Sequence, residues 1–523
     1  MELIATTAFL AGLIMLIILA PLLRRKARAA KSMAANGSRR PPPPGPCPLP
    51  FIGSIHHLVT SQPQAALRDL ARKHGPVMHL RLGQVDTVVI SSPAAAQEAL
   101  RDKDASLASR PSLLGSEVIC YGGLDIAFAP YGGYWRALRR LCTAELLSAG
   151  KVRRLAAVRD SETMSLVREI RAAAAAGEPV DLGGMLLSCT NSITGMAAFG
   201  DRCSGELRRD FMAAIKVVIG NISGFCVSDL FPSLRFVDVV TGTKRRLRRA
   251  HQQLEDVFGK IISEGEARRE ERKKKATDAG GEEDDDDLLS VLLSIRDDGQ
   301  FEIPIGDTNI KGIILDLFTA GTETTSSVAE WLMTELIRNP DAMVKAQEEV
   351  REAFRHRSPH EHESQIDKLH YTRLVIRETL RLYPPLPLLL PRLCRETCDV
   401  GGFEVAKGSR VIVNAWAIAR SPEHWDDADK FMPERFENSA AADYRVTQFD
   451  FLPFGHGRRI CPGMGFGLSV LEVLVARLLY YFDWRLPDGM QVQDLDMEMT
   501  VGAAARRTNQ LRLVAEPYYQ VPM

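Results

Sequence analysis

Residues 307–339 carry an uninterrupted helical pattern that sets the scale of the fold. Asp307 can cap the start, and Asn339 precedes Pro340, which disfavours continuation of the helix. A helix of about 33 residues would be about 50 Å long, so it must cross the whole body of the protein. Near residues 313–318 it is apolar around most of its circumference, which indicates a buried position. The body is therefore predicted to be mainly helical.

Two more segments show long helical patterns, at residues 371–381 and at about 462–482. The second is strongly apolar, but Glu472 and Arg477 inside it argue against a membrane span. A charged tract at residues 264–287 lacks large apolar side chains and is predicted to be a solvated loop between helices. Short strand-like pieces indicate small β-sheets beside the helices, for example residues 79–82 and 86–90.

Composition excludes several classes of protein. With 45% hydrophobic and 25% charged residues among 523, the chain can build a real core, which excludes a disordered tail protein and a collagen-like fibre. The 66 basic and 66 acidic side chains balance, which argues against a nucleic-acid binder. Nine cysteines scattered over the chain fit a reducing compartment in which one or two thiols matter.

The amino-terminal segment predicts a membrane anchor. Residues 3–23 contain no charge and would span about 30 Å as a helix. Basic residues crowd the next stretch, including Arg24, Arg25 and Lys26, so this flank should remain cytosolic. A cleaved signal peptide is the alternative, but it would have its basic residues before a shorter apolar run.

A proline-rich stretch, residues 41–50, follows the anchor and should form a stiff extended spacer. A ligand for a proline-binding domain is the alternative, which the position between anchor and body disfavours. We therefore expect three parts: a transmembrane anchor at 1–23, a basic and proline-rich linker at 24–50, and a globular body at 51–523.

Several motifs of other enzyme classes do not occur in the chain, namely GxGxxG, GxxxxGKS/T, GxSxG and HExxH. Without a dinucleotide fingerprint, any redox chemistry must draw its electrons from elsewhere. Four histidines could bind a metal, but their polar, proline-containing setting favours a solvated loop; they are His356, His360, His362 and His370.

The segment Phe454-Gly-His-Gly-Arg-Arg-Ile-Cys-Pro-Gly463 is the strongest chemical signal. It is a glycine-rich turn that delivers Cys461 to the start of a helix, where backbone N–H groups and the helix dipole favour a thiolate. Its glycines let the main chain approach a flat partner closely. Arg459 could pair with an acidic group on that partner.

These residues match the pattern F-x-x-G-x-R-x-C-x-G, so the chain resembles the haem-thiolate monooxygenases, the cytochrome P450 family. The resemblance implies the P450 fold, mainly α with small β-sheets, and a haem b cofactor. Cys461 would be its axial iron ligand, whose electron donation favours O–O cleavage. Other residues would contact the haem, with the arginines and the tryptophan at the propionates: Phe454, Gly455, Arg459, Trp135, Arg139, Arg392 and Ala320.

Two further motifs agree with the resemblance. Glu378 and Arg381 share a helix face, and Arg435 in Pro433-Glu-Arg-Phe436 would complete the family's buried Glu-Arg-Arg network, which is structural. Residues 320–325, Ala-Gly-Thr-Glu-Thr-Thr, resemble the family's oxygen-side motif. There Thr324 and Glu323 would relay protons to reduced oxygen, although threonine in a helix often only bonds back to a carbonyl and bends the helix.

The substrate is less constrained than the chemistry. By resemblance, mostly aliphatic side chains would line the pocket: Ile126, Phe318, Leu386, Leu388, Leu389 and Val501. Such a pocket suits a small hydrophobic molecule better than an ion. The stretches 84–93 and 387–398 are similar to grass oxidases of pimaradiene-type diterpenes. A terpenoid is therefore the expected substrate class, while phenolic and flavonoid substrates remain open.

The resemblance also implies partners and a location. A plant microsomal monooxygenase would use O2 and electrons from NADPH through NADPH-cytochrome P450 reductase, with its catalytic domain (51–523) on the cytosolic side of the endoplasmic reticulum membrane. It would contact membrane lipid and no nucleic acid. A haem-thiolate isomerase or dehydratase that needs no O2 is the alternative, which Thr324 and Glu323 disfavour. A non-enzymatic binding protein would require every motif to be coincidental.

Overall fold

The computed structural model describes residues 40–200, 209–215, 226–279, 287–437, 448–502 and 504–519. The expected anchor at 1–23 lies outside these residues, as does the part of the linker before residue 40.

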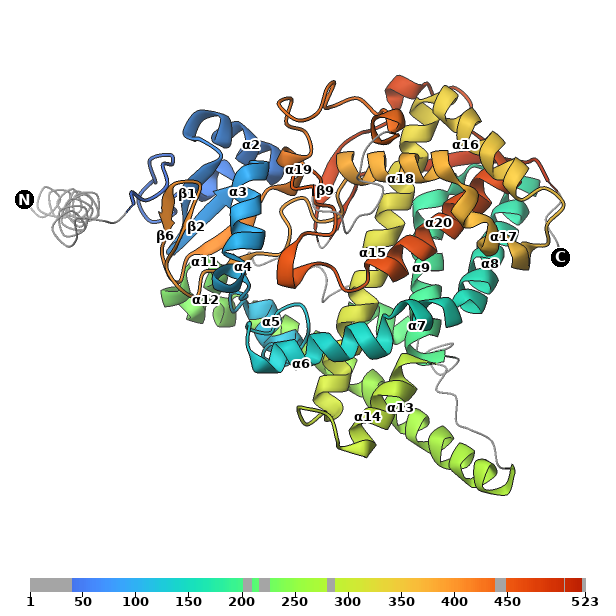
Figure 1. The fold of residues 1–523 in the computed structure, drawn as a ribbon, viewed down its shortest axis with the longest axis horizontal. Coiled ribbons are helices and arrows are strands. Elements are labelled where there is room, and N and C mark those ends of the chain that lie inside the picture. Colours follow the sequence, from blue (N-terminus) through green and yellow to red (C-terminus); the bar gives the residue numbers. More distant parts are fainter. Residues whose placement is uncertain are drawn as a thin grey trace, which may run out of the picture.

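Helices make up most of the body (Figure 1). They are α2 (Pro63–His74), α3 (Pro93–Gln97), α4 (Asp104–Leu107), α5 (Leu114–Ile119), α6 (Gly133–Leu141), α7 (Ala149–Arg154), α8 (Ala156–Ala175), α9 (Leu182–Phe199), α11 (Val227–Leu230), α12 (Arg235–Val240), α13 (Thr243–Ala279), α14 (Leu288–Asp298), α15 (Asp307–Arg338), α16 (Pro340–Ala353), α17 (His362–Gln365), α18 (His370–Leu382), α19 (Ala415–Ile418) and α20 (Met464–Tyr481). The prediction of a mainly helical body is confirmed.

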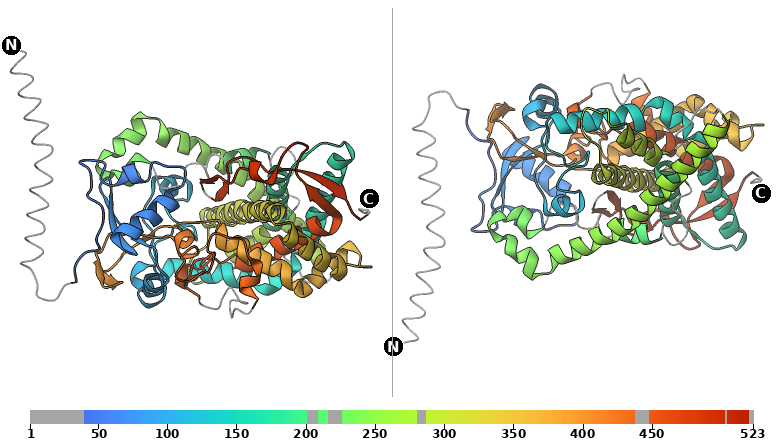
Figure 2. Two further views of the ribbon diagram at one scale, coloured as in Figure 1. Left: turned by 90° about the horizontal axis from the view of Figure 1, so that it is seen from above. Right: turned by 90° about the horizontal axis from the view of Figure 1, so that it is seen from below.

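Helix α15 crosses the whole body, as its length requires (Figures 1 and 2). It packs against α9, α14, α16, α18 and α20, and most of its second half is buried. Its start differs in detail from the prediction. The cap is Gly306, whose N–H donates to Asn309 Oδ1 at 2.9 Å. Asp307 occupies the first helical position and pairs with Arg296 at 2.8 Å.

The β-structure is small and lies mainly at one end of the molecule (Figure 1). The largest sheet has the order β1-β2-β7-β4, with β1 and β2 antiparallel, Val77 opposite Ile90, and β2 and β7 parallel. The remaining strands form three smaller sheets: the two-stranded β5-β6 and β10-β9, and the three-stranded β3-β11-β8. The strands are β1 (Val77–Leu82), β2 (Val85–Ile90), β3 (Val180–Asp181), β4 (Arg392–Leu393), β5 (Cys398–Val400), β6 (Phe403–Val405), β7 (Arg410–Val413), β8 (Phe482–Arg485), β9 (Met499–Val501), β10 (Ala505–Arg507) and β11 (Arg512–Pro517).

Helix α20 is long and apolar enough to cross a membrane, and it is the one such helix among the described residues. Its most apolar stretch is 67% buried inside the body. Its charged side chains form hydrogen bonds and ion pairs with neighbouring elements. Arg477 donates to the carbonyls of Asp160 and Pro359, and Glu472 pairs with Arg373 at 3.0 Å. The helix is therefore a core element, in agreement with the prediction.

The charged tract at 264–287 is helical up to Ala279, and for that part the prediction of a loop is wrong. Helix α13 continues through it to Ala279, and residues 280–286 lie outside the described part. Acidic and basic side chains alternate along the early tract, so pairs three and four residues apart can stabilise an exposed helix without apolar contacts. Asp287 then caps α14 by accepting from Ser290 N at 2.9 Å.

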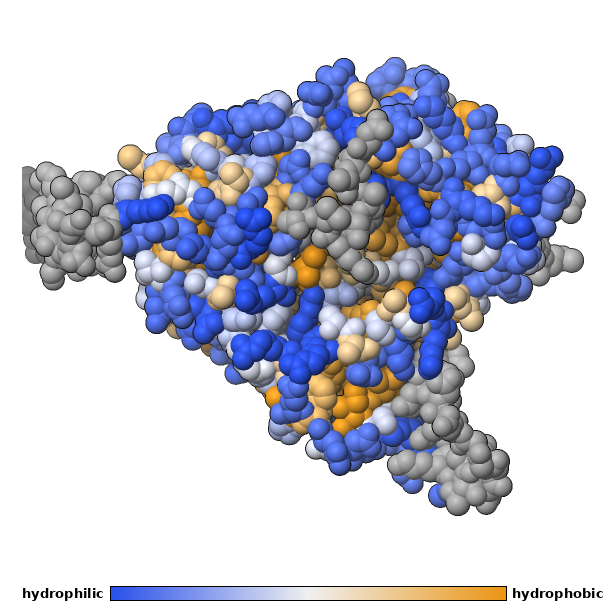
Figure 3. Space-filling view, viewed as in Figure 1, coloured by the Kyte–Doolittle hydropathy of each residue, from blue (hydrophilic) through white to orange (hydrophobic). Residues whose placement is uncertain are grey.

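The four histidines do not form a metal site in the described residues. His362 is 1% exposed and stacks on Phe354 with 4.1 Å between the ring centroids. His360, in contrast, is exposed and contacts Asp160 at 2.6 Å. The prediction of a solvated loop is therefore wrong for His362, which is buried at the start of α17, whereas His360 is exposed. Most side chains on the face shown in Figure 3 are hydrophilic, and apolar side chains are visible in places, including hollows.

Candidate active site

The cysteine loop is held in its shape by backbone hydrogen bonds. Cys461 N donates to Phe454 O at 3.0 Å, which closes the loop just before α20, and Gly455 N donates to Leu452 O at 3.1 Å. Gly457 has φ +75°, and a Cβ there would lie 2.2 Å from Leu100 O. Only glycine fits this close approach. The sequence therefore places Cys461 beside the start of α20 through local geometry.

The thiol of Cys461 faces a large internal cavity of about 940 Å³. Burial raises the pKa of Cys461, while the Gly463 N–H and the Arg139 guanidinium act in the opposite direction. The helix start alone therefore does not make a free thiolate here. Coordination to a metal would convert Cys461 to a thiolate, because a ligating thiol loses its proton outright. A buried thiol whose pKa is raised is a poor free nucleophile.

Arg459 lines the cavity, and its guanidinium carbon lies 4.2 Å from the centroid of the Trp135 ring. Its guanidinium donates to Ala108 O at 2.8 Å and to Ile126 O at 3.1 Å, and also to Ala129 O. Burial, reinforced by neighbouring Arg392, lowers the pKa of Arg459 to about 9. The side chain is thus a desolvated cation whose present partners are neutral.

Arg392 is the one predicted propionate partner with a carboxylate. It donates to Asp104 Oδ1 at 2.6 Å and to His456 O at 2.8 Å, in a buried position. The second oxygen of Asp104 accepts from Arg458 N at 2.9 Å and from its side chain at 3.0 Å. Asp104 therefore joins α4 to the cysteine loop. Sequence reasoning missed it, since its partners lie several hundred residues away.

Arg110 is a second residue that sequence reasoning missed. It lines the cavity, is 7% exposed, and donates to Ala127 O, Leu390 O and Pro391 O, each at 2.9 Å. Burial, together with Arg459 and Arg392, lowers its pKa well below the ordinary value. Nothing in its sequence setting, Ser-Arg-Pro, signals this role.

The cluster of cations tests whether the site fits haem. Among the described residues, no carboxylate lies within ion-pairing distance of Arg110, Arg139 or Arg459. Buried cations without anions are costly. A flat ligand with two carboxylates would neutralise them while Cys461 faces the same space. The donor set therefore fits iron protoporphyrin.

Helix α15 brings its motif to the opposite wall. Thr324 Oγ1 donates to Ala320 O at 2.6 Å, so the back-bond that bends a helix is present. The hydroxyl oxygen can still accept a proton, because each hydroxyl has two lone pairs. Glu323 also lines the cavity and forms an ion pair with Arg506 of β10. Gly321 allows α9 to approach, since a Cβ would lie 3.2 Å from Thr194 Oγ1.

The predicted pocket residues are divided by the structure. Five of the six line the cavity, together with all eight predicted cofactor-binding residues. These five are Ile126, Leu386, Leu388, Leu389 and Val501. Phe318 is not among the described residues that line it. Its ring packs against Phe211 with 4.7 Å between centroids, on the side of α15 that faces the helical core.

Asp316 holds one wall of the cavity in place. Its Oδ2 accepts from Ile126 N at 2.7 Å and from Ala127 N at 2.9 Å. The carbonyl of Ile126 accepts in turn from Trp135 Nε1 at 3.0 Å. Burial, and then Asp125 beside it, raises the pKa of Asp316 well above the usual range. The raised pKa favours the neutral carboxyl, and Asp316 acts here as a hydrogen-bond acceptor for two backbone N–H groups.

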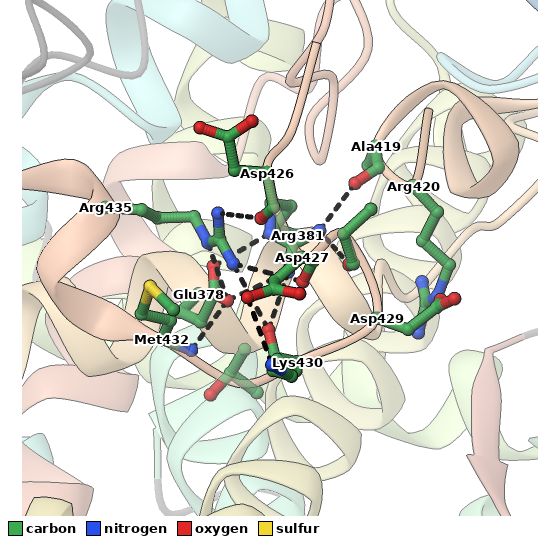
Figure 4. A network of polar contacts seen from close by, with 12 residues as sticks. Glu378, Arg381, Ala419, Arg420, Asp426, Asp427, Asp429, Lys430, Met432 and Arg435 are labelled. Atoms are coloured by element: carbon green, nitrogen blue, oxygen red, sulfur yellow. Dashed lines mark hydrogen bonds and ion pairs between the residues drawn. The ribbon is translucent and has the colours of Figure 1, made fainter. Parts of the chain in front are cut away.

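The Glu378, Arg381 and Arg435 side chains meet in a buried cluster away from the cavity (Figure 4). Glu378 pairs with Arg381 through both oxygens at 2.8 Å and with Arg435 at 3.0 Å. Arg381 also donates to Ala419 O and Ala428 O, each at 2.7 Å. The cluster joins α18 to the segment before the cysteine loop.

Comparison with known proteins agrees with this site. A family model described as cytochrome P450 matches residues 42–513. The 9-beta-pimara-7,15-diene oxidase of Oryza sativa subsp. japonica is 56% identical over 517 residues, covering 99% of this chain and 98% of that protein. The premnaspirodiene oxygenase of Hyoscyamus muticus is 45% identical, covering 92% and 94%. A zebra fish cytochrome P450 solved with progesterone has a TM-score of 0.73 at 25% identity, covering 87% and 99%.

These matches confirm the predicted family and the helical fold with small sheets. They also confirm the enzyme class, a monooxygenase whose family uses haem, O2 and electrons from a reductase. The match spans almost the whole described body. This chain belongs to the cytochrome P450 family.

Proposed function

We propose that this monooxygenase hydroxylates or further oxidises a diterpene hydrocarbon of the pimaradiene type, using haem b with Cys461 as the iron ligand. Electrons would come from NADPH through NADPH-cytochrome P450 reductase. One observation carries the proposal: Cys461, the arginines around the cysteine loop and the α15 motif all line a single cavity whose remaining walls are largely aliphatic. The 56% identity to a pimaradiene oxidase supports the substrate class.

The residues of this chain have separable roles in the proposed reaction. When bound, haem supplies the activation of O2, and the thiolate ligand favours cleavage of the O–O bond. Arg110, Arg139, Arg392 and Arg459 would neutralise the propionates. Thr324 would accept a proton at Oγ1 and release its own hydroxyl proton into the cavity. Without that transfer, reducing equivalents would leave as hydrogen peroxide.

The charge state of the walls supports an uncharged substrate. The arginines cluster around the cysteine loop, where the propionates of the cofactor would pair with them. Burial raises the pKa of Asp316, which favours its neutral form, and its Oδ2 accepts from two backbone N–H groups. An ionised ligand would find little compensation for its lost water in the aliphatic part. A hydrocarbon would lose only unfavourable contact with water.

The surface supports attachment to the endoplasmic reticulum membrane. Gly83 N donates to Ile52 O at 3.2 Å, and Gln84 N donates to Leu230 O at 2.8 Å, so residues near 52 lie beside α11 and α12. Exposed apolar side chains occur in both stretches: Phe51 (70%), Val59 (79%), Phe236 (62%) and Val240 (81%). Contiguous exposed apolar residues are typical of surfaces that contact membrane or protein. We infer that this end faces the bilayer.

A spectral titration tests the substrate proposal. The purified ferric protein is titrated with a pimaradiene, a flavonoid and a simple phenol, and each binder is then turned over with reductase and NADPH. A blue-shifted Soret band and oxygenated product with the diterpene alone would support the proposal. Turnover confined to the phenolic compounds would replace the substrate class. Conversion of a hydroperoxide without NADPH would favour the isomerase alternative.

Two variants test the parts of the proposal separately. Cys461→Ala should lose the red-shifted Soret band of the reduced carbon monoxide complex. Retention of that band would remove Cys461 as the ligand. Deletion of residues 2–40 should move the protein towards the soluble fraction with haem retained. Continued sedimentation, abolished by Phe236→Ser together with Val240→Ser, would assign the remaining contact to the exposed apolar end.

A further inference from the structure

We propose that Arg506 is a positioning residue that holds the Glu323 carboxylate at the solvent-facing end of the cavity, where Glu323 collects protons for Thr324. The inference rests on the proposed function, and it assigns a new residue to that site. Nothing in the sequence motifs marks Arg506, which lies near the carboxyl end of the chain. Three features support this role: the anchoring of β10, the ion pair itself, and a polar path to solvent.

Strand β10 is fixed against α15 just beyond the oxygen-side motif. Ser327 Oγ donates to Ala505 O at 2.5 Å, and Trp331 Nε1 donates to the same carbonyl at 3.2 Å. Ala505 N donates to Pro385 O at 2.8 Å on the opposite side. The backbone at Ala505 is thus bonded to two neighbouring elements. Its position relative to α15 is therefore set by buried hydrogen bonds, which are sensitive to displacement.

From this fixed strand, the Arg506 guanidinium reaches back along α15 and pairs with Glu323. The Glu323 side chain is 14% exposed, while that of Arg506 is 33% exposed. The pair therefore spans the boundary between the cavity and the surface. A partly buried pair of this kind restricts where the carboxylate can go more than an exposed pair would. Glu323 is held towards β10 until it exchanges partners.

A polar strip connects the pair to water. Thr500 lies opposite Arg506 in the β9–β10 register, and Thr508 is two residues further along, so all three share one face of the hairpin. The two threonine hydroxyls are 2.9 Å apart, and both threonines are exposed yet also line the cavity. Water can therefore reach Glu323 along this face without crossing the aliphatic walls.

The proton balance of the proposed step is simple. The Glu323 carboxylate takes one proton from water on the Arg506 side and becomes neutral, which weakens its attraction to the guanidinium. The neutral carboxyl can then give its proton to Thr324 Oγ1, while the Thr324 hydroxyl turns away from Ala320 O and releases its own proton into the cavity. Glu323 returns to Arg506 as a carboxylate. Arg506 gains and loses no proton.

The test measures product formed per NADPH consumed in the full-length protein with reductase. Arg506→Gln should lower this coupling to about the level of Glu323→Gln, a loss of roughly tenfold or more for a removed proton carrier. Arg506→Lys should restore most of it, since the charge is kept. The double variant should be no worse than Glu323→Gln alone, because Arg506 acts through Glu323. Arg506→Met, which keeps the aliphatic stem, repeats the test if the glutamine variant folds poorly.

Two controls separate a role in proton supply from a purely structural role of the arginine. Arg485→Gln breaks an exposed arginine pair with Glu516 (2.6 Å) on β8 and β11, and should leave coupling unchanged. The thermal midpoints of the Glu323 and Arg506 single and double variants should be non-additive, which reports the pair without turnover. An additive effect of Arg506→Gln on coupling, or no effect, would overturn the proposal. Loss of the thiolate carbon monoxide band in the unmodified protein would instead overturn the proposed function.

Discussion

Replacing Glu378 by glutamine should destabilise the fold severely, although the two side chains have nearly the same shape. The carboxylate accepts from Arg381 Nε and Nη2 at 2.8 Å, from Arg435 Nε at 3.0 Å and from Met432 N at 2.9 Å. Glu378 and Arg381 are fully buried. The glutamine variant would leave two guanidinium groups facing a neutral amide, one of whose groups is itself a donor.

The expected cost follows from that geometry. Removing one partner of a buried ion pair costs about 3–5 kcal/mol, against a total stability of about 5–15 kcal/mol. An unfolding entropy of about 2.1 cal/mol/K per residue makes each kcal/mol worth about 1 °C in a domain of this size, so Glu378→Gln should lower the midpoint by roughly 3–5 °C. Lys345→Ala is the matched control, because Lys345 and Glu434 form a 2.8 Å pair that is exposed. Such a pair is worth about 0–1 kcal/mol.

The arginines should rank in a defined order. Arg381 is fully buried and also bonds to Ala419 O and Ala428 O, whereas Arg435 retains 8% exposure. Lysine cannot reproduce the fork of donors, so Arg381→Lys should cost more than Arg435→Lys. The assay follows unfolding by circular dichroism and, separately, loss of the thiolate carbon monoxide band. A Glu378→Gln midpoint within about 1 °C of the Lys345→Ala midpoint would refute the reasoning.

Three other changes test separate parts of the structure. Thr324→Ala should keep the haem spectrum and raise hydrogen peroxide formed per NADPH about tenfold; unchanged peroxide would argue against the relay. Burial raises the pKa of Asp316, so the folded state binds more protons than the unfolded state and its stability falls as pH rises above about 4. Asp316→Asn should therefore raise the thermal midpoint more at pH 8 than at pH 5, and an equal change at both would contradict this. Gly457→Ala puts a Cβ 2.2 Å from Leu100 O at φ +75° and should abolish haem incorporation; normal haem content would show that the loop can shift.

Features with a local pattern were the most predictable from the sequence. Helices α15, α18 and α20 were expected within a few residues of their bounds, because uninterrupted periodicity and prolines mark them. The cysteine loop was also predictable, since glycines that permit close approach lie beside the cysteine itself. The helical part of the charged tract was missed, because pairing between neighbouring turns can replace the apolar face that helix prediction relies on.

Phe318 shows a different limit. Helix α15 is surrounded by protein, so it has apolar side chains towards the cavity and also towards the aromatic cluster with Phe211. Periodicity distinguishes a buried face from an exposed one and does not distinguish two buried faces. The side on which Phe318 lies depends on which neighbour packs there, and that is a tertiary property.

The missed polar residues follow from the same reasoning. Asp104, Arg110 and Arg506 each act through partners that lie far away in the sequence: the cysteine loop for Asp104, the 390–391 segment for Arg110 and α15 for Arg506. A charge pattern on one element cannot reveal such a partner. What marks Asp104 and Arg110 is burial of a charge without local compensation, and what marks Arg506 is an ion pair between two elements. Only the folded chain displays either feature. Some of these buried charges, such as Arg110 and Arg392, line the cavity, whereas others, such as Glu378 and Arg381, lie away from it. Burial alone therefore does not mark the site, and the cation cluster is recognised because its members share one cavity.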